Sequence, residues 1–186
     1  MTASVPRGAE SWTLDDLYDL PDDGNRYELI EGRLLVSPAP ARPHFRAATR
    51  LHRLLLRAAP EHLAVGQNAG LVDGPKKATY FIPDLVVVPD AVLDLDGPAL
   101  LPSETLLAVE ILSPDSASTD DVTKRYWYAR LGIRQYWIVD PKARQLAVML
   151  LRTDRSQYRD AAVVRAGETW QTDSPFPIEL DPAAFC

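Results

Sequence analysis

Two apolar segments of the chain each contain a single acidic residue. Asp84 lies in residues 82–88, and Glu110 lies in residues 106–112. Removing a carboxylate from water costs several kcal/mol unless hydrogen bonds, a cation or a metal ion compensate it. Two carboxylates at one place repel each other, and a divalent cation held by oxygen ligands relieves that repulsion. Asp84 and Glu110 are therefore candidate metal ligands, with strand capping or arginine pairing as the alternative.

Glu28 is a third acid among apolar residues, in residues 27–30. Two or three carboxylates completed by water suit Mg²⁺, for which Mn²⁺ is a candidate substitute. Such an ion lowers the pKa of a bound water, directs it at a phosphorus atom and stabilises the leaving oxygen. The acids therefore predict a catalytic site for phosphate ester hydrolysis.

Lys124 lies in a helix expected over about residues 119–131, directly after the Glu110 segment. Its side chain is long enough to reach back over the strand ends. An ammonium group there can orient the attacking water or stabilise charge that builds up on the phosphate. A structural alternative stays open, because Asp120 and Asp121 stand at helical ion-pair spacings from Lys124.

A run of arginines marks the helix expected from Pro43 to about Ala59. The arginines recur at steps of four, three and four, which places them in one narrow stripe: Arg46, Arg50, Arg53 and Arg57. Residues 32–80 contain eight basic and two acidic residues, a net charge of +6 (8 − 2). The stripe can therefore lie along a phosphate backbone, with a solvated helix face as the alternative. The opposite, apolar face is expected to comprise Phe45, Ala48, Leu51, Leu55 and Ala59.

The pattern of the remaining segments predicts an α/β (α+β) fold. The strand–helix–strand order from Glu110 to Asp140 predicts a parallel crossover. Other expected elements are a short helix at about 13–20, a hairpin over 27–36, a strand over 64–72, and antiparallel strands at 145–151, 158–164 and near Ile178.

Composition fits one globular domain over residues 1–186. Hydrophobic residues make up 46% of the 186 residues, charged residues 25%, and the net charge is −6. Cys186 is the single cysteine, which excludes an intramolecular disulfide. No apolar stretch approaches the roughly 18 residues of a membrane span, and residues 1–10 lack the apolar centre of a signal peptide. We therefore expect a cytoplasmic protein that makes no membrane contact.

Taken in order, these motifs resemble the PD-(D/E)XK nuclease superfamily and, more closely, the bacterial Uma-two family of nucleases. The matching pieces span about residues 12–150: 26–32, 37–44, Pro83–Asp84, 109–114, Asp121 with Lys124, and 136–141. The resemblance implies a restriction-endonuclease-like mixed β-sheet flanked by helices, with additional antiparallel strands at both ends, the C-terminal ones at about 145–180. It also implies Mg²⁺-dependent cleavage of nucleic acid, with DNA as the expected substrate, and a homodimer.

The resemblance assigns roles residue by residue. It implies metal binding by Asp84 and Glu110 and a supporting role for Glu28. The superfamily pattern has a lysine two residues after the glutamate, where this chain has Leu112. In the Uma-two family that lysine lies in the following helix, which implies a catalytic role for Lys124. His44 occupies a position that the family often fills with histidine, so a catalytic role and a local hydrogen-bonding role both stay open.

Two non-enzymatic alternatives stay open. Leu112 in place of the expected lysine and the acidic net charge fit a nucleic-acid-binding module that lacks catalysis. Trp127 and Tyr128 can mark a protein-interaction surface instead, although we expect at least one of them in the core.

Overall fold

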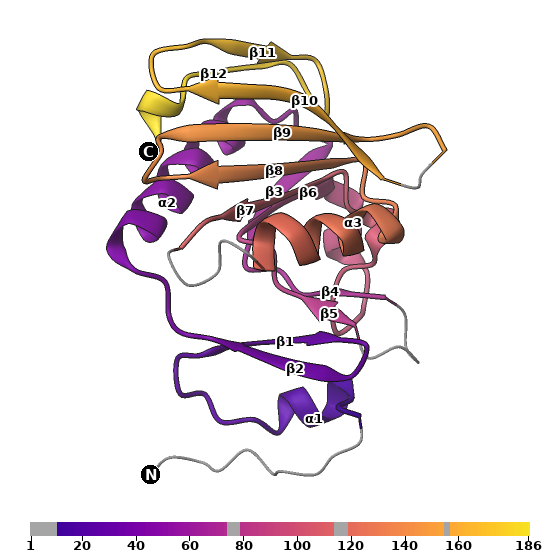
Figure 1. Ribbon diagram of the computed structural model, residues 1–186. Coiled ribbons are helices and arrows are strands. Elements are labelled where there is room, and N and C mark those ends of the chain that lie inside the picture. The colour runs from indigo at the N-terminus through magenta and orange to yellow at the C-terminus, as the bar shows by residue number, and fades with distance from the viewer. Residues whose placement is uncertain (1–10, 74–78, 114–118, 155–156) are drawn as a thin grey trace.

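The computed structural model describes residues 11–73, 79–113, 119–154 and 157–186, without the side chains of residues 119–121. Its centre is a six-stranded sheet in the order β10-β9-β8-β7-β6-β3 (Figure 1). The strands are β3 (Leu63–Gln67), β6 (Leu85–Pro89), β7 (Leu107–Ile111), β8 (Gln135–Asp140), β9 (Gln145–Leu151) and β10 (Tyr158–Arg165). β7 and β8 pair in parallel and all other neighbours are antiparallel, so the sheet is mixed, and the expected crossover is confirmed.

A four-stranded sheet, β2-β1-β5-β4, lies beside α1 (Leu14–Tyr18) at one end of the molecule (Figure 1). Its strands are β1 (Arg26–Ile30), β2 (Arg33–Ser37), β4 (Leu71–Val72) and β5 (Tyr80–Phe81). Glu31 and Gly32 join β1 to β2 with φ values of 48° and 77°, the backbone of a type I′ hairpin turn. The expected hairpin is thus confirmed.

The prediction of a single strand over residues 64–72 is wrong. Residues 63–67 form β3 of the large sheet, whereas residues 71–72 form β4 of the small sheet. The chain changes direction at Asn68, whose φ is 51° and whose N–H donates to the carbonyl of Asp84 (3.2 Å). Asparagine tolerates this left-handed conformation better than most residues, and Gly66 and Gly70 lie two residues to either side, so the turn is compatible with the sequence.

Two helices flank the large sheet. α2 (Arg42–Ala58) lies behind it and α3 (Arg125–Leu131) lies in front (Figure 1). The helix expected over 119–131 begins as a π-helical segment, η3 (Thr119–Lys124), and becomes α-helical at Arg125. Gly132, at φ 81°, caps it. No described helix has the length and apolar character needed to cross a lipid bilayer.

The remaining elements are short. They are the two-stranded sheet β11 (Trp170–Thr172) and β12 (Ile178–Leu180), and the 3₁₀ segments η1 (Asp90–Asp94), η2 (Pro102–Glu104) and η4 (Pro182–Ala184).

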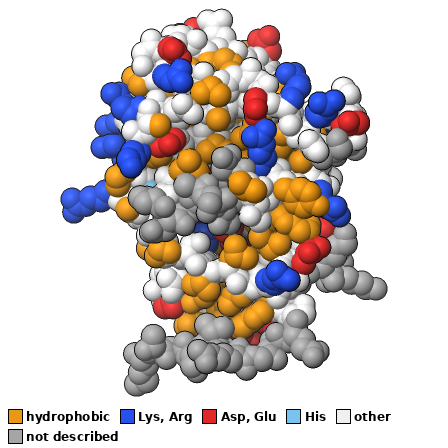
Figure 2. All heavy atoms as spheres, viewed as in Figure 1, with side chains coloured by type: hydrophobic (Ala, Val, Ile, Leu, Met, Phe, Trp, Pro, Cys, Tyr) orange, Lys and Arg blue, Asp and Glu red, His pale blue; other side chains and the backbone are white. Residues whose placement is uncertain are grey.

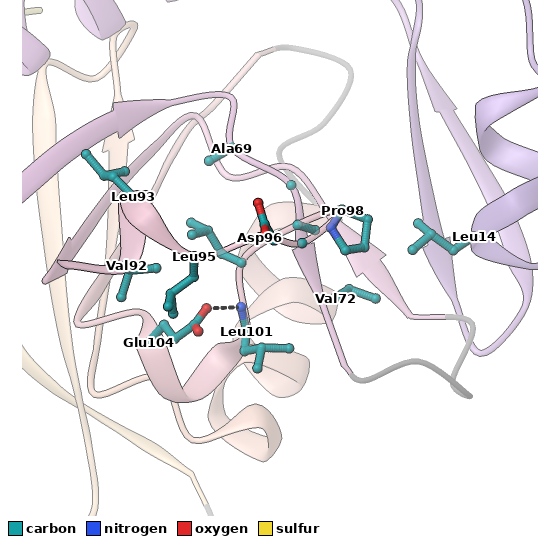
Figure 3. A pocket seen from close by; sticks show the side chains of 14 residues that line it. Leu14, Ala69, Val72, Val92, Leu93, Leu95, Asp96, Pro98, Leu101 and Glu104 are labelled. Carbon is teal, nitrogen blue, oxygen red and sulfur yellow. Dashed lines mark hydrogen bonds between the residues drawn. The ribbon is translucent and has the colours of Figure 1, made fainter. Parts of the chain in front are cut away.

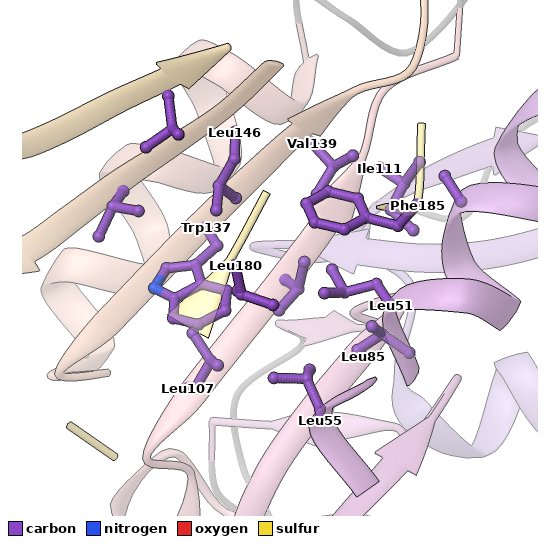
Figure 4. Packing of buried hydrophobic residues seen from close by; sticks show 14 of the residues in the cluster. Leu51, Leu55, Leu85, Leu107, Ile111, Trp137, Val139, Leu146, Leu180 and Phe185 are labelled. Carbon is purple, nitrogen blue, oxygen red and sulfur yellow. The ribbon is translucent and has the colours of Figure 1, made fainter. Parts of the chain in front are cut away.

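Each face of the large sheet has its own apolar core. The α2-side core joins α2 to alternate residues of β6 to β9 and to the C-terminal segment; its members include Leu51, Leu55, Leu85, Trp137 and Phe185 (Figure 4). The α3-side core lies on the other face and includes Phe81, Ala108, Tyr128, Tyr136 and Tyr158. Val109 and Ile111 belong to the first core and Ala108 to the second, which is the alternation expected of a strand buried on both faces.

The buried face of α2 includes the expected Leu51 and Leu55, with Ala48 and Ala59 packed partly against the same core, but it differs from the prediction at Phe45. Its buried residues are His44, Ala47, Leu51 and Leu55, whereas Phe45 is 65% exposed. At about 100° per residue Phe45 lies more than a quarter turn from the centre of this stripe. The prediction failed because His44 takes the buried position in the first turn.

Leu51 and Leu56 provide a matched test of this packing. Leu51→Ala is expected to lower the free energy of unfolding by about 2–5 kcal/mol, because Leu51 is fully buried in the α2-side core. Leu56→Ala, on the same helix but 55% exposed, should change it by less than about 0.5 kcal/mol. Urea denaturation measures both, and equal losses would contradict the assigned orientation of α2.

Candidate active site

The pairing of β6 with β7 brings the two predicted acids to one place. Leu85 faces Val109 in this antiparallel ladder, so one further step places Asp84 opposite Glu110. Both side chains are buried, with 3% and 1% of their surface exposed. A short loop before β6 thus presents one carboxylate and the end of β7 presents the other.

Three groups surround the carboxylate of Asp84. His44 Nε2 lies 2.9 Å from Oδ2, and the backbone N–H of Ile111 donates to the same oxygen at 2.8 Å. Arg26 Nη2 forms an ion pair with Oδ1 at 2.9 Å. Burial acts to raise the pKa of Asp84, but the His44 hydrogen bond and the Arg26 charge outweigh it and hold that pKa below the usual 3.8. Asp84 is therefore ionised at neutral pH.

Lys124 links the other two acids. Its Nζ lies 3.0 Å from Glu110 Oε1 and 3.0 Å from Glu28 Oε1, and its side chain is only 3% exposed. Glu28 Oε1 also accepts from the backbone N–H of Ile82 (2.8 Å). The structure thus places the Lys124 ammonium group at the strand ends. The side chains of its alternative partners, Asp120 and Asp121, lie outside the described part of the chain.

Two residues of the site escaped the sequence-based assignment. Arg26 pairs with Asp84, and Tyr128 Oη donates to Glu110 Oε1 at 2.6 Å. Alternation along β1 places Arg26 on the same face as Glu28, and helical spacing places Tyr128 one turn after Lys124. The sequence therefore contained a local pattern that pointed to each of these two residues. Tyr128 is fully buried, which confirms that at least one of the two helix aromatics belongs to the core.

Tyr128 stays protonated at neutral pH. Burial raises its pKa well above 10, and the nearby charges of Glu110 and Glu28 raise it further. Tyr128→Phe is expected to lower the free energy of unfolding by about 1–3 kcal/mol, because buried Glu110 loses a hydrogen-bond donor. Tyr126→Phe is the matched control, since Tyr126 is 54% exposed and should give almost no change. Urea denaturation measures the free energy of unfolding of both variants. Equal values for the two would contradict a structural role for the Tyr128 hydroxyl.

The donor set fits a hard divalent cation that keeps much of its hydration. Three carboxylates, those of Glu28, Asp84 and Glu110, face the cationic side chains of Arg26 and Lys124 and the imidazole of His44 in a buried place. Asp84 Oδ1 accepts no aligned hydrogen bond within the described residues, although Arg26 is close. In the part of the chain that the structure describes, no group of three or more His, Cys, Asp or Glu side chains is already arranged to hold a metal ion. Mg²⁺ bound through two carboxylates, with water and phosphate completing its coordination, is compatible with both findings.

The predicted arginine stripe lies on the surface. All four arginines are exposed on α2: Arg46, Arg50, Arg53 and Arg57. Figure 2 shows basic side chains gathered along the edge of the molecule over α2. His44, in the first turn of this helix, ties it to Asp84. The helix that carries the arginines is thus anchored at the acidic cluster.

An open cavity lies elsewhere, between α1 and the segment from η1 to η2. It has a volume of about 640 Å³ and mostly apolar walls, including Leu14, Val92, Leu95 and Leu101 (Figure 3). Glu104 is among its acidic residues, and it accepts the backbone N–H of Leu101 at 2.7 Å. The cavity shares no residue with the Asp84–Glu110 cluster.

Comparison with known families agrees with this architecture. The model of the Uma2 family, described as "Putative restriction endonuclease", matches residues 14–184. The chain belongs to the Uma2 family. No curated protein shows a significant match.

A solved structure supports the fold assignment of this Uma2 protein. The crystal structure of "a putative nuclease belonging to DUF820" from Anabaena variabilis ATCC 29413 superposes with a TM-score of 0.73 at 18% sequence identity, over 93% of this chain and 96% of that one. The predicted family and the restriction-endonuclease-like fold are thereby confirmed. Within this fold, Leu112 packs partly against the α3-side core, and the amine beside Glu110 comes from Lys124 instead.

Proposed function

We propose that this Uma2 protein is a metal-dependent nuclease that hydrolyses phosphodiester bonds of nucleic acid, with DNA as the expected substrate. The observation that carries the proposal is the buried cluster in which Lys124 bridges Glu28 and Glu110 beside Asp84. Burying three acids and a lysine in one place is costly for stability, and such clusters occur preferentially at functional sites.

Each residue has a defined part in this proposal. Asp84 and Glu110 would hold Mg²⁺ or Mn²⁺, which when bound supplies a Lewis acid and lowers the pKa of a water. Arg26 and the Ile111 N–H fix the orientation of the Asp84 carboxylate. Lys124 holds Glu28 and Glu110 in place, and its ammonium group can stabilise negative charge on the phosphate.

A substrate panel tests the proposal. Supercoiled plasmid, single-stranded circular DNA and a structured RNA are incubated with the protein in Mg²⁺, in Mn²⁺ and in EDTA, and the products are resolved on gels. We expect cleavage of at least one DNA substrate with metal and none in EDTA. Binding of nucleic acid without cleavage under any condition would favour the non-catalytic binding module. One observation supports that alternative: Arg26 and Lys124 already pair with Asp84 and Glu110 and neutralise their charge.

The arginine stripe makes a separate prediction. The triple substitution Arg46→Gln, Arg50→Gln and Arg53→Gln should weaken nucleic-acid binding across sequences and reduce the slope of log affinity against log salt by about 3, roughly one per arginine. The control neutralises three exposed arginines away from α2: Arg152, Arg159 and Arg165. Fluorescence anisotropy over a salt series measures both. Equal effects of the two triples would show that only net charge matters and that α2 does not contact the phosphates.

A further inference from the structure

Phe45 is a large apolar side chain that the fold does not use. It lies in the first turn of α2 and is 65% exposed, whereas its neighbours His44 and Ala47 are buried. Exposing an aromatic ring of this size forgoes about 1.5–3 kcal/mol of burial energy. A single exposed apolar residue needs no explanation by itself, so the surroundings of Phe45 decide its meaning.

Phe45 is attached directly to the active-site cluster. It follows His44, whose Nε2 lies 2.9 Å from Asp84 Oδ2, and adjacent Cα atoms are about 3.8 Å apart. Because His44 is buried and Phe45 is exposed, the ring lies at the surface, on the residue next to the one that contacts Asp84. The start of α2 and the end of β7, which carries Glu110, lie on the same side of the molecule (Figure 1).

The electrostatic surroundings of Phe45 favour a phosphate chain. Arg42 and Arg46 are exposed three residues before it and one residue after it. The first turn of α2 contains no acidic residue, and its N-cap, Ala41, offers no side-chain hydrogen bond. The positive end of the helix dipole is therefore also available to an anion. An exposed aromatic ring among cations is the arrangement on which bases of single-stranded nucleic acids stack.

We propose that Phe45 is a stacking platform for an unpaired base next to the cleaved phosphate, so that the preferred substrate is single-stranded nucleic acid. This inference rests on the proposed nuclease function and narrows its substrate class. In duplex the faces of the bases are covered by their neighbours, whereas a single strand can present one to the ring while Arg42 and Arg46 contact the adjoining phosphates.

Tyr126 on α3, another exposed aromatic residue, is less suited to this role. Its ring already has an edge-to-face contact with Trp127, and Arg130 lies 5.6 Å from its centroid. Lys124 and Tyr128 face the cluster, and Tyr126 lies midway between them in sequence, on the opposite side of the helix turn. Figure 2 shows the hydrophobic surface over α3. Tyr126 therefore serves as a control for an exposed aromatic beside an arginine.

The test measures binding separately from cleavage. Fluorescein-labelled oligothymidylate and oligouridylate of about 12 nucleotides, within the ~4–16 nucleotides that such sites cover, and a duplex of equal length are titrated with protein in EDTA at low salt. The proteins are wild type, Phe45→Ala, Phe45→Trp, Tyr126→Ala and the arginine triple variant. Circular dichroism confirms that each is folded.

We expect wild type to bind a single strand more tightly than duplex. Phe45→Ala should weaken single-strand binding by about 5- to 100-fold and leave duplex binding unchanged, while Phe45→Trp and Tyr126→Ala keep wild-type affinity. Single-strand binding that depends on the arginines but not on Phe45 would overturn the stacking role and leave the proposed function intact. A loss of single-strand binding in Tyr126→Ala, and not in Phe45→Ala, would overturn the stacking role of Phe45 and place the single-strand contact on α3. An absence of binding to every probe would overturn both the inference and the proposed function.

Discussion

Lys124→Met is expected to lower the free energy of unfolding by about 3–5 kcal/mol, the cost of removing one partner from a buried ion pair. Lys124 Nζ lies 3.0 Å from both Glu28 and Glu110, and all three side chains are buried. Methionine matches the lysine stem in length but lacks the charge, so two buried carboxylates lose a shared cation without a large cavity being created. The repulsion between the two carboxylates lowers the free energy of unfolding further.

Lys142→Met is the matched control, because Lys142 is exposed beyond the end of β8. Urea denaturation at neutral pH is expected to show a change within about 0.5 kcal/mol for this variant. If Lys124→Met were as mild as its control, Lys124 would not be the residue that compensates the buried acids, and its place in the proposed mechanism would be lost with it.

Asp84→Asn is expected to reduce metal-dependent cleavage by about 100-fold or more while the protein stays folded. The substitution keeps the size of the side chain but removes the charge that Arg26 and His44 stabilise at 2.9 Å each. Asp160→Asn changes a largely exposed carboxylate paired with Arg125 at 2.7 Å, and should retain full activity. Initial rates on the responsive substrate compare the two. Undiminished cleavage by Asp84→Asn would show that the chemistry occurs elsewhere.

The same variant has a defined pH signature in stability. The pKa of Asp84 is lowered in the folded protein, since the His44 hydrogen bond and the Arg26 charge outweigh the effect of burial. The ionised carboxylate therefore contributes stability that is fully present above its ordinary value of 3.8 and is lost as the pH falls below it. Urea denaturation should accordingly show the difference between wild type and Asp84→Asn narrowing from pH 7 to about pH 3. A constant difference would contradict the lowered pKa.

The sequence predicted those parts of the site that leave a local trace. Asp84 and Glu110 interrupt apolar segments, and Lys124 follows at a distance its side chain can span. Two further residues could have been found from local patterns: Arg26 from the alternation along β1, and Tyr128 from its position one helical turn after Lys124. The bridge from Lys124 to Glu28 left no such trace, because it joins segments nearly a hundred residues apart in the sequence.

The errors in the predicted fold have the same origin. Phe45 was expected in the core because it is apolar, but His44 occupies the buried position since Asp84 provides a partner for its ring. The strand predicted over 64–72 divides at Asn68, whose N–H meets the Asp84 carbonyl. Both depend on a contact with a distant segment, which hydrophobic periodicity does not record.

Calorimetric titration of Mn²⁺ into wild type and into Glu110→Gln tests the central claim most directly, because it needs no knowledge of the substrate. Glutamine keeps the length of the side chain and can still accept from Tyr128, so the variant removes one charge with little change in shape. We expect wild type to bind Mn²⁺ saturably, and Glu110→Gln to lose this binding or to weaken it at least about tenfold. Equal binding by the two proteins, or none by a folded wild type even when an oligonucleotide is present, would contradict a metal site at Asp84 and Glu110.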